Sequence, residues 1–244
     1  MRRYGPNTLA YSFGPGPITP AVKWIIWANV VMFVATLVFQ GVIFEPLALS
    51  PQMVLERGWI WQPVTYMFLH ANAMHILFNM LGVWMFGVEL ERLWGTNYFL
   101  RYYAVAGVGA AITTLAVAFL PFAFAASVYA SLTVGASGAL YGILLAFAMY
   151  YPNRPILMML LFPVPAKYFV IIIGALSFAT GGTGVAHAAH LGGLLFGYLY
   201  LSRGRGGTLT AEIKYRYLKW KMNRLRRKFD VYSGGRGDWD RHVH

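Results

Sequence analysis

The sequence predicts an all-α polytopic membrane protein with a bundle of six transmembrane helices. Hydrophobic residues make up 58% of its 244 residues, and charged residues make up only 11%. A soluble domain carries about 25% charged residues, so this composition is typical of a chain embedded in a membrane. We expect a leader at residues 1–20, the six-span domain at 21–202 and a basic tail at 203–244.

Six apolar stretches are the predicted membrane spans. They cover residues 22–44, 70–88, 98–119, 137–151, 167–180 and 186–202. The first has the length of about 20 residues that a bilayer core requires. The apolar run after the fourth span is interrupted by Pro163, Pro165 and Lys167. Because a lysine at mid-bilayer is costly, we expect 156–165 to lie in the membrane interface and a short fifth span to start at Lys167.

The remaining segments are expected to be loops. Residues 45–68 mix charged and apolar residues and contain Trp59 and Trp61, which are typical anchors at a membrane interface. We therefore expect this segment to be an outer loop that lies in the interface. Residues 120–134 are an uncharged, aromatic connection between the third and fourth spans.

The distribution of basic residues predicts which side of the membrane each terminus faces. Six spans place both termini on one side, and the positive-inside rule assigns that side to the cytoplasm. Under this topology, Arg57 is the only Lys or Arg that falls outside. We therefore expect a multi-pass protein of the cell membrane, such as a bacterial inner membrane. Glu91 and Arg92 then lie in an inner loop, where we expect an ion pair or a hydrogen-bonded turn.

The tail after residue 202 holds 12 of the 20 Lys and Arg residues. Such a tail is typical of a cytoplasmic segment that contacts anionic membrane lipids, and we do not expect it to bind nucleic acid. Between Thr210 and Phe229, basic residues mix with aromatic and aliphatic ones, as in an amphipathic surface helix. A solvated tail is an equally good interpretation. No pattern in the sequence predicts an oligomeric state.

Missing residue types restrict the chemistry. The chain contains no cysteine, which excludes disulfides, thiolate nucleophiles and cysteine-based metal sites. It has no Asp or Glu between Glu91 and Glu212, and it has no HExxH motif. We therefore expect neither a metal nor another cofactor.

Polar residues in three spans are expected to meet at one depth below the outer face. Ser137 opens the fourth span, His190 lies early in the sixth, and His75 and Asn79 lie in the first half of the second. All three spans enter the membrane from the same side. Ionisable residues within a membrane are candidates for a functional site, and convergence from three helices strengthens that interpretation.

Small residues predict how the fourth and sixth spans pack. Gly138 and Gly142 recur at four-residue spacing, and so do Gly193 and Gly197. Such stripes allow transmembrane helices to approach closely. The approach would bring the hydroxyl of Ser137 within hydrogen-bond reach of His190.

A serine paired with a histidine is the minimal activated nucleophile. Because no carboxylate is available to orient the histidine, we expect Ser137 and His190 to act as a catalytic dyad. Tyr141 shares a helix face with Ser137 and is the candidate to position the imidazole. The backbone N–H of Ser137 and the side chains of His75 and Asn79 could stabilise an oxyanion.

These residues form a pattern that is known from one family. They are Gly135, Ser137, Gly138 and Tyr141 in the fourth span, Ala189, His190, Gly193 and Gly197 in the sixth, His70, His75, Asn79 and Met80 in the second, and Trp61, Glu91, Arg92 and Gly95 in loops. Over roughly residues 22–202, the chain resembles the rhomboid intramembrane serine proteases. The resemblance implies a six-helix rhomboid-like bundle and a serine endopeptidase that cleaves transmembrane segments of other membrane proteins.

The resemblance also implies roles for single residues. It implies a Ser137–His190 dyad, an oxyanion site that includes His75 and Asn79, and a Tyr141 ring against His190. One residue departs from the family pattern. Many members have Trp-Arg in the first loop, where this chain has Trp61 followed by Gln62. That arginine is structural in the family, so we expect the departure to affect stability more than chemistry.

Other interpretations stay open. Ser137 could be a packing serine, His187 is expected at the mouth of the cavity, and His70 is expected to hold the first loop or to cap the second span. The whole chain could be a non-catalytic rhomboid-like protein that binds membrane clients. A transporter would favour acidic residues or repeats in the spans, and the sequence shows neither. The segment 181–184 and the fifth span are candidates for a moving gate.

Overall fold

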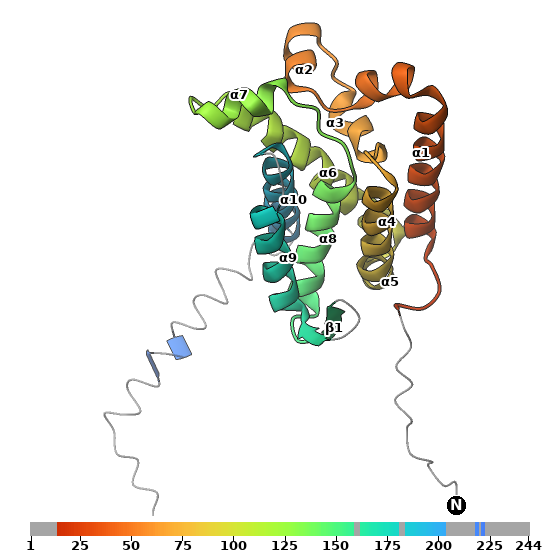
Figure 1. Ribbon diagram of the computed structural model, residues 1–244. Helices are drawn as coiled ribbons and strands as arrows, with labels where there is room; N and C mark the ends of the chain where they lie inside the picture. Colours follow the sequence, from red (N-terminus) through yellow and green to blue (C-terminus); the bar gives the residue numbers. More distant parts are fainter. Residues whose placement is uncertain (1–13, 159–161, 181–183, 204–217, 220, 223–244) are drawn as a thin grey trace, which may run out of the picture. The chain divides into compact units, whose positions relative to one another are not determined.

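The computed structural model describes residues 14–158, 162–180, 184–203, 218–219 and 221–222. The chain divides into two compact units, Met1–Leu201 and Ser202–His244. The first unit contains the helical bundle (Figure 1). The leader before residue 14, residues 181–183 of the candidate gate segment and most of the predicted amphipathic tail helix lie outside the described residues.

The described elements are mostly helices. In chain order they are α1 (Pro20–Leu47), α2 (Pro51–Arg57), α3 (Gln62–Thr65), the 3-10 helix η1 (Tyr66–Phe68), α4 (Ala73–Gly82), the π-helical η2 (Val83–Gly87), α5 (Val88–Trp94), α6 (Thr96–Ala118), α7 (Ala123–Ala130), α8 (Ser137–Tyr150), β1 (Pro155–Met158), β2 (Phe162–Pro165), α9 (Ala166–Thr180) and α10 (Gly184–Arg203). A helix or a continuous run of helices occupies each of the predicted spans.

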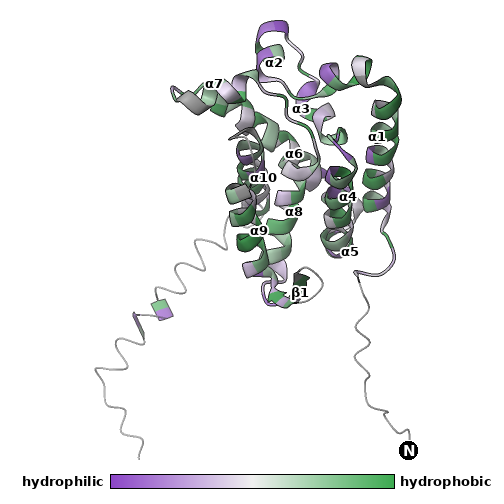
Figure 2. Cartoon of the chain, viewed as in Figure 1, coloured by the Kyte–Doolittle hydropathy of each residue, from purple (hydrophilic) through white to green (hydrophobic). Residues whose placement is uncertain are grey.

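Within the described residues, three helical stretches are long and apolar enough to cross a membrane: Pro20–Phe39, Ala73–Trp94 and Thr96–Ala118. The helix α8 and residues Ala166–Ser177 of α9 are apolar but shorter. Large apolar side chains point outward from the bundle, and Trp24, for example, is 72% exposed. Figure 2 shows hydrophobic residues along the long helices and hydrophilic ones at α2. An apolar outer surface of this kind is typical of a membrane protein.

Two span boundaries differ from the prediction. The backbone of Phe39 leaves helical geometry (φ −121°, ψ 35°), so the first membrane-length stretch ends there and not near residue 44. Gly41 lowers helix propensity close to this kink. The second span continues through a π-helical segment to Trp94, beyond the predicted end at residue 88. The connection 120–134 contains the helix α7, which the sequence analysis did not predict.

The protein is mostly helical, as predicted, but two short strands depart from the all-α prediction. β1 and β2 pair in antiparallel orientation, with Pro155 opposite Pro165. Proline breaks a helix interior but is tolerated where a strand has a free edge, and both strands of a two-stranded sheet have one. The segment that we expect in the membrane interface therefore contains two extended stretches, Pro155–Met158 and Phe162–Pro165.

The helix α8 lies at the centre of the bundle, in contact with α4, α6 and α9 (Figure 1). Two buried tyrosines fix the helices around it. The hydroxyl of Tyr102 donates to the carbonyl of Gly142 over 2.6 Å, and that of Tyr66 donates to the carbonyl of Gly107 over 2.7 Å. Each buried hydroxyl thus has an acceptor, which removes the cost of placing it in an apolar core.

The side chain of Glu91 caps the N-terminus of α1. Its carboxylate accepts hydrogen bonds from the backbone N–H groups of Ala21 and Val22 over 2.9 and 3.0 Å, and from the Thr19 hydroxyl. These are the N–H groups that a helix start leaves without partners, and a negative charge is favourable there. Of the two expectations for Glu91 and Arg92, the ion pair is wrong, because Arg92 donates to the carbonyls of Pro15 and Pro17. The hydrogen-bonded turn is present, since the N–H of Gly95 donates to the Glu91 carbonyl over 2.7 Å.

The segment 45–68, which we expect to be an outer loop, is organised by Gln62, where the chain departs from the rhomboid pattern that it otherwise resembles. Its side chain is fully buried. Its amide nitrogen donates to the carbonyls of Glu45 and Pro46, each over 3.3 Å, and its amide oxygen accepts from the N–H of Ser50 over 2.9 Å. Trp61 donates to the same Pro46 carbonyl over 2.8 Å. These bonds join the end of α1 to α3.

Candidate active site

Ser137 is the first residue of α8, where backbone N–H groups lack partners within the helix. The preceding segment is fixed by an antiparallel bridge between Leu49 and Thr133 and by a hydrogen bond of 2.9 Å from the N–H of Gly135 to the Tyr66 carbonyl. Gly135 has φ +117°, a conformation that favours glycine. The chain therefore turns sharply just before Ser137 and directs it into the bundle.

Ser137 and His190 come together between α8 and α10. Their Oγ and Nε2 atoms are 2.9 Å apart, which is hydrogen-bond distance. The two helices approach so closely that a Cβ on Gly193 would overlap the carbonyl oxygen of Gly138. A Cβ on Gly197 would lie 3.2 Å from the Cα of Gly142. The predicted glycine stripes therefore form the contact that sets this distance.

The ring of Tyr141 stacks on the imidazole of His190, with centroids 4.1 Å apart and an interplanar angle of 16°. Tyr141 lies one turn after Ser137 on α8. Its hydroxyl is 3.5 Å from the Ile173 carbonyl of α9. The stack restricts rotation of the imidazole, because tilting the ring would separate the two faces.

His75 and Asn79 line the same cavity as Ser137, Tyr141 and His190, and its volume is about 330 Å³. The His75 ring lies over Gly135, where an added Cβ would be 2.7 Å from its Cε1 atom. Its Nδ1 accepts from the N–H of Ala71 over 3.4 Å, so Nε2 carries the proton when the ring is neutral. Asn79 donates to the His75 carbonyl over 2.8 Å. Both side chains are thus held in the wall of the cavity.

His70 does not line this cavity. It is 2% exposed, and its ring meets the His75 ring edge to face at 5.0 Å. It does not cap the second span, because Asn72 accepts the hydrogen bond from the N–H of His75 at the start of α4. The expectation that His70 caps the second span is therefore wrong, and the expectation that it holds the first loop stays a prediction.

Within the described residues, no group of three His, Asp or Glu side chains could hold a metal ion. What the site does offer is a hydroxyl, an imidazole and nearby N–H donors in an apolar enclosure. This set can perform acyl transfer, since it has a nucleophile, a base and donors for a developing oxyanion.

The Rhomboid domain model matches residues 57–204, which is more than half of the chain. The chain belongs to the rhomboid family. The matched region includes the second, fourth and sixth predicted spans and so contains all the residues of the cavity. The resemblance drawn from the sequence motifs is confirmed.

Curated rhomboid relatives share about a third of the aligned residues. The chain is 32% identical to the rhomboid protease AarA of Providencia stuartii over 160 residues, which are 61% of this chain and 57% of that protein. It is 32% identical to the rhomboid protease GluP of Bacillus subtilis over 145 residues, which are 59% of this chain and 26% of that protein. It is 31% identical to the mitochondrial rhomboid protein 1 of Saccharomyces cerevisiae over 160 residues, which are 62% of this chain and 45% of that protein. The chain thus spans about a quarter to three fifths of these relatives.

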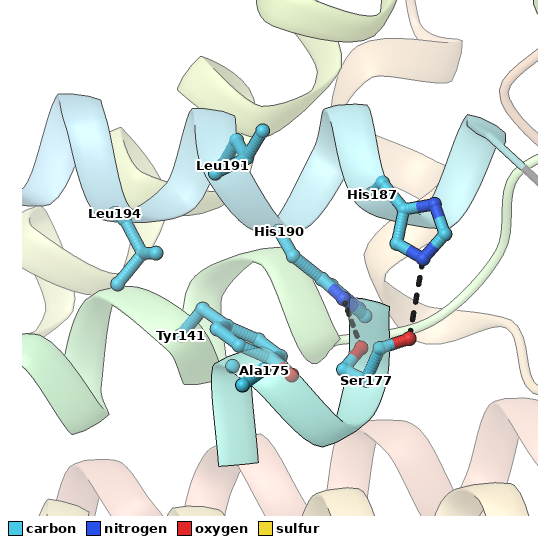
Figure 3. Close-up of a pocket in the computed structure, with 8 residues that line it drawn as sticks. Tyr141, Ala175, Ser177, His187, His190, Leu191 and Leu194 are labelled. Carbon is cyan, nitrogen blue, oxygen red and sulfur yellow. Dashed lines mark hydrogen bonds between the residues drawn. The ribbon is translucent and has the colours of Figure 1, made fainter. Parts of the chain in front are cut away.

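One residue beside the rhomboid site was missed by the sequence analysis. Ser177 of α9 lies with its Oγ 3.1 Å from the Nδ1 of His190 (Figure 3), whereas Ser137 Oγ lies beside the other ring nitrogen, Nε2. His187, expected at the mouth of the cavity, has its Nε2 3.1 Å from the Ser177 carbonyl. A lone serine in an apolar span was the available signal, and the rule that selected Ser137 could have selected Ser177 too.

Proposed function

We propose that this rhomboid is an intramembrane serine endopeptidase in which Ser137 is the nucleophile and His190 is the general base. The observation that carries the proposal is the 2.9 Å separation of Ser137 Oγ and His190 Nε2 at the wall of a cavity inside an apolar bundle. A packing serine needs no imidazole at this distance. Two of the relatives are named rhomboid proteases, which supports the same reaction.

In the first step, Ser137 Oγ attacks the scissile carbonyl carbon while its proton passes to His190 Nε2. The carbonyl electrons move to the oxygen and give a tetrahedral oxyanion. When this intermediate collapses, the C–N bond breaks and the leaving amine takes the proton from Nε2. A water molecule then attacks the acyl-enzyme and gives its proton to His190. Release of the acid returns the proton to Ser137.

The oxyanion would form beside the start of α8. The N–H of Ser137 belongs to the positive end of this helix, and the His75 Nε2–H and the Asn79 amide line the same cavity. Fixed donors in an enclosure with little water stabilise a developing charge without reorganising. We assign His75 and Asn79 to this role and Tyr141 to positioning of the base.

The substrates would be transmembrane segments of other membrane proteins. A helical backbone keeps its carbonyls bonded, so a segment that unwinds easily would be preferred. We further propose that the chain crosses a cell membrane, such as a bacterial inner membrane, six times with both termini in the cytoplasm. We also propose that the basic tail contacts anionic lipids. In this topology the cavity opens below the outer surface, where water can reach it.

The test is cleavage of a labelled single-span membrane substrate by the purified full-length protein in liposomes. We expect the wild type to cleave, and we expect Ser137→Ala and His190→Ala to lose activity by about 10⁴-fold or more. Ser131→Ala is the matched control, because Ser131 is a partly buried residue directly after α7 and its hydroxyl donates to the carbonyl of Ser127, four residues earlier. Its rate should equal that of the wild type.

A fluorophosphonate probe gives a second measurement that needs no substrate. It should label the wild type and Ser131→Ala but not Ser137→Ala. If the wild type neither cleaves any of several helix-weakened substrates nor takes the label, the proposal is wrong. A non-catalytic protein that binds membrane clients would then be the better interpretation.

A further inference from the structure

His190 has a hydrogen-bond partner at each ring nitrogen, and within the part of the chain that the structure describes neither partner is a carboxylate. Its Nε2 is 2.9 Å from Ser137 Oγ, and its Nδ1 is 3.1 Å from Ser177 Oγ. A general base in this geometry must accept the Ser137 proton at Nε2, so a neutral His190 has to carry its own proton at Nδ1. The Nδ1–H then has one acceptor in place, the hydroxyl oxygen of Ser177.

We propose that Ser177 is a positioning residue for His190. Its hydroxyl takes the orienting place that a carboxylate has in a catalytic triad. It fixes the tautomer whose Nε2 faces Ser137, and it accepts the Nδ1–H bond of the imidazolium that forms when Ser137 attacks. This proposal rests on the proposed function, because it concerns the base of that reaction.

The position of Ser177 is itself fixed by α10. Its carbonyl is among the last four of α9, which ends at Thr180, and such carbonyls lack a partner within their helix. His187 lies with its Nε2 3.1 Å from this carbonyl. A carbonyl oxygen can only accept, so His187 donates from Nε2. One residue of α9 is thus bonded through its backbone to His187 and through its side chain to His190 (Figure 3).

The same face of α9 also meets Tyr141. Ile173 lies one turn before Ser177, and its carbonyl is 3.5 Å from the Tyr141 hydroxyl. A cavity of about 260 Å³ lies between these groups and α10, and its lining includes Tyr141, Ser177, His187 and His190. The helix α9 therefore contacts both the imidazole of His190 and the ring that stacks on it. Because this contact is made by single side chains beside a cavity, one substitution can remove it without disturbing the bundle.

Threonine and valine provide a matched pair at position 177. They have nearly the same shape, and only threonine keeps the hydroxyl. With full-length protein in liposomes and a labelled single-span substrate, we expect Ser177→Thr to keep kcat within about threefold of the wild type. Ser177→Val and Ser177→Ala should lower kcat about tenfold and leave KM within about twofold. Ile171→Ala, which changes an exposed side chain of the same helix, should have no effect.

Fluorophosphonate labelling of Ser137 gives the second readout, and it should rank the variants in the same order without requiring substrate entry. Equal kcat for the Thr and Val variants would overturn the role of the hydroxyl, and so would a loss that lies in KM alone. These outcomes would leave the proposed function intact, because the wild type would still cleave. A wild type that neither cleaves nor takes the label would remove both proposals.

Discussion

The helix α10 contacts α8 and α9 in different ways. Toward α8 it presents glycines, and the two backbones touch, so that Gly193 leaves no room for a Cβ beside Gly138. Toward α9 it presents imidazoles, which bond to Ser177 beside a cavity of about 260 Å³. The first contact cannot yield without separating the helices, whereas the second can be broken by rotating one side chain. The α8 contact therefore sets the distance between nucleophile and base, and the α9 contact sets the orientation of the base.

The largest effect is expected from Gly193→Ala, which breaks the α8 contact. The added methyl group would overlap a backbone oxygen of Gly138, so α8 and α10 must move apart. We expect a loss of about 100-fold or more in cleavage, together with a destabilisation of about 1–3 kcal/mol. Cleavage rate and thermal unfolding in detergent measure the two effects. Gly41→Ala in α1 is the control, because nothing lies within 4 Å of its added Cβ.

A smaller loss is expected from Gly135→Ala, which tests the other support of Ser137. Alanine at φ +117° is strained, and its Cβ would press on the His75 ring at 2.7 Å. We expect cleavage to fall by about 10- to 100-fold, because both the turn before Ser137 and an oxyanion donor are displaced. If cleavage by this variant is unchanged, His75 is not held where the mechanism needs it.

Tyr141 takes part in both the α8 and the α9 contact of the site, since it projects from α8 and its hydroxyl approaches α9. Tyr141→Leu removes the ring that stacks on His190, and we expect kcat to fall about fivefold. Tyr141→Phe keeps the ring and should stay within about twofold of the wild type. If the Phe variant loses as much as the Leu variant, the hydroxyl and its approach to α9 matter more than the stack.

The smallest effect is expected from an exposed hydrogen bond outside the site. Its contribution to stability can be compared with those of the α8 and α9 contacts of α10. The Tyr129 hydroxyl of α7 donates to Glu56 of α2 over 2.7 Å, and this hydrogen bond lowers the pKa of the Glu56 carboxyl below its usual 4.5. A lowered pKa means that the bond stabilises the fold above about pH 4.5 and that this contribution disappears as the pH falls through the folded-state pKa. We expect Tyr129→Phe to lower the Tm slightly at pH 7 and to approach the wild type as the pH falls through the folded-state pKa of Glu56. Thermal unfolding over a pH series measures the difference, and cleavage should not change.

The sequence predicted most of the helices and all but one of the cavity residues that the mechanism uses. The apolar runs located the helices because burial in lipid demands continuous hydrophobicity. The four-residue spacing of Gly138, Gly142, Gly193 and Gly197 predicted which faces of α8 and α10 meet. The sequence did not predict the pairing of β1 with β2, because prolines exclude a helix without specifying which strand pairing replaces it. The sequence analysis also missed the kink at Phe39, because a nearby glycine is the only local signal for it.

Residue type and spacing by themselves predicted apolar helices and placed a serine and a histidine on helices with glycine stripes, and the resemblance of these motifs indicated the rhomboid family. The placement of these residues is a property of single helices, because spacing along a chain fixes which side chains share a face. Only the tertiary structure decided that Ser177 meets the second nitrogen of His190, that Gln62 joins α1 to α3, and that Glu91 binds the start of α1. Each of these contacts depends on where one helix lies relative to another, and that placement results from many weak contacts that no local pattern records.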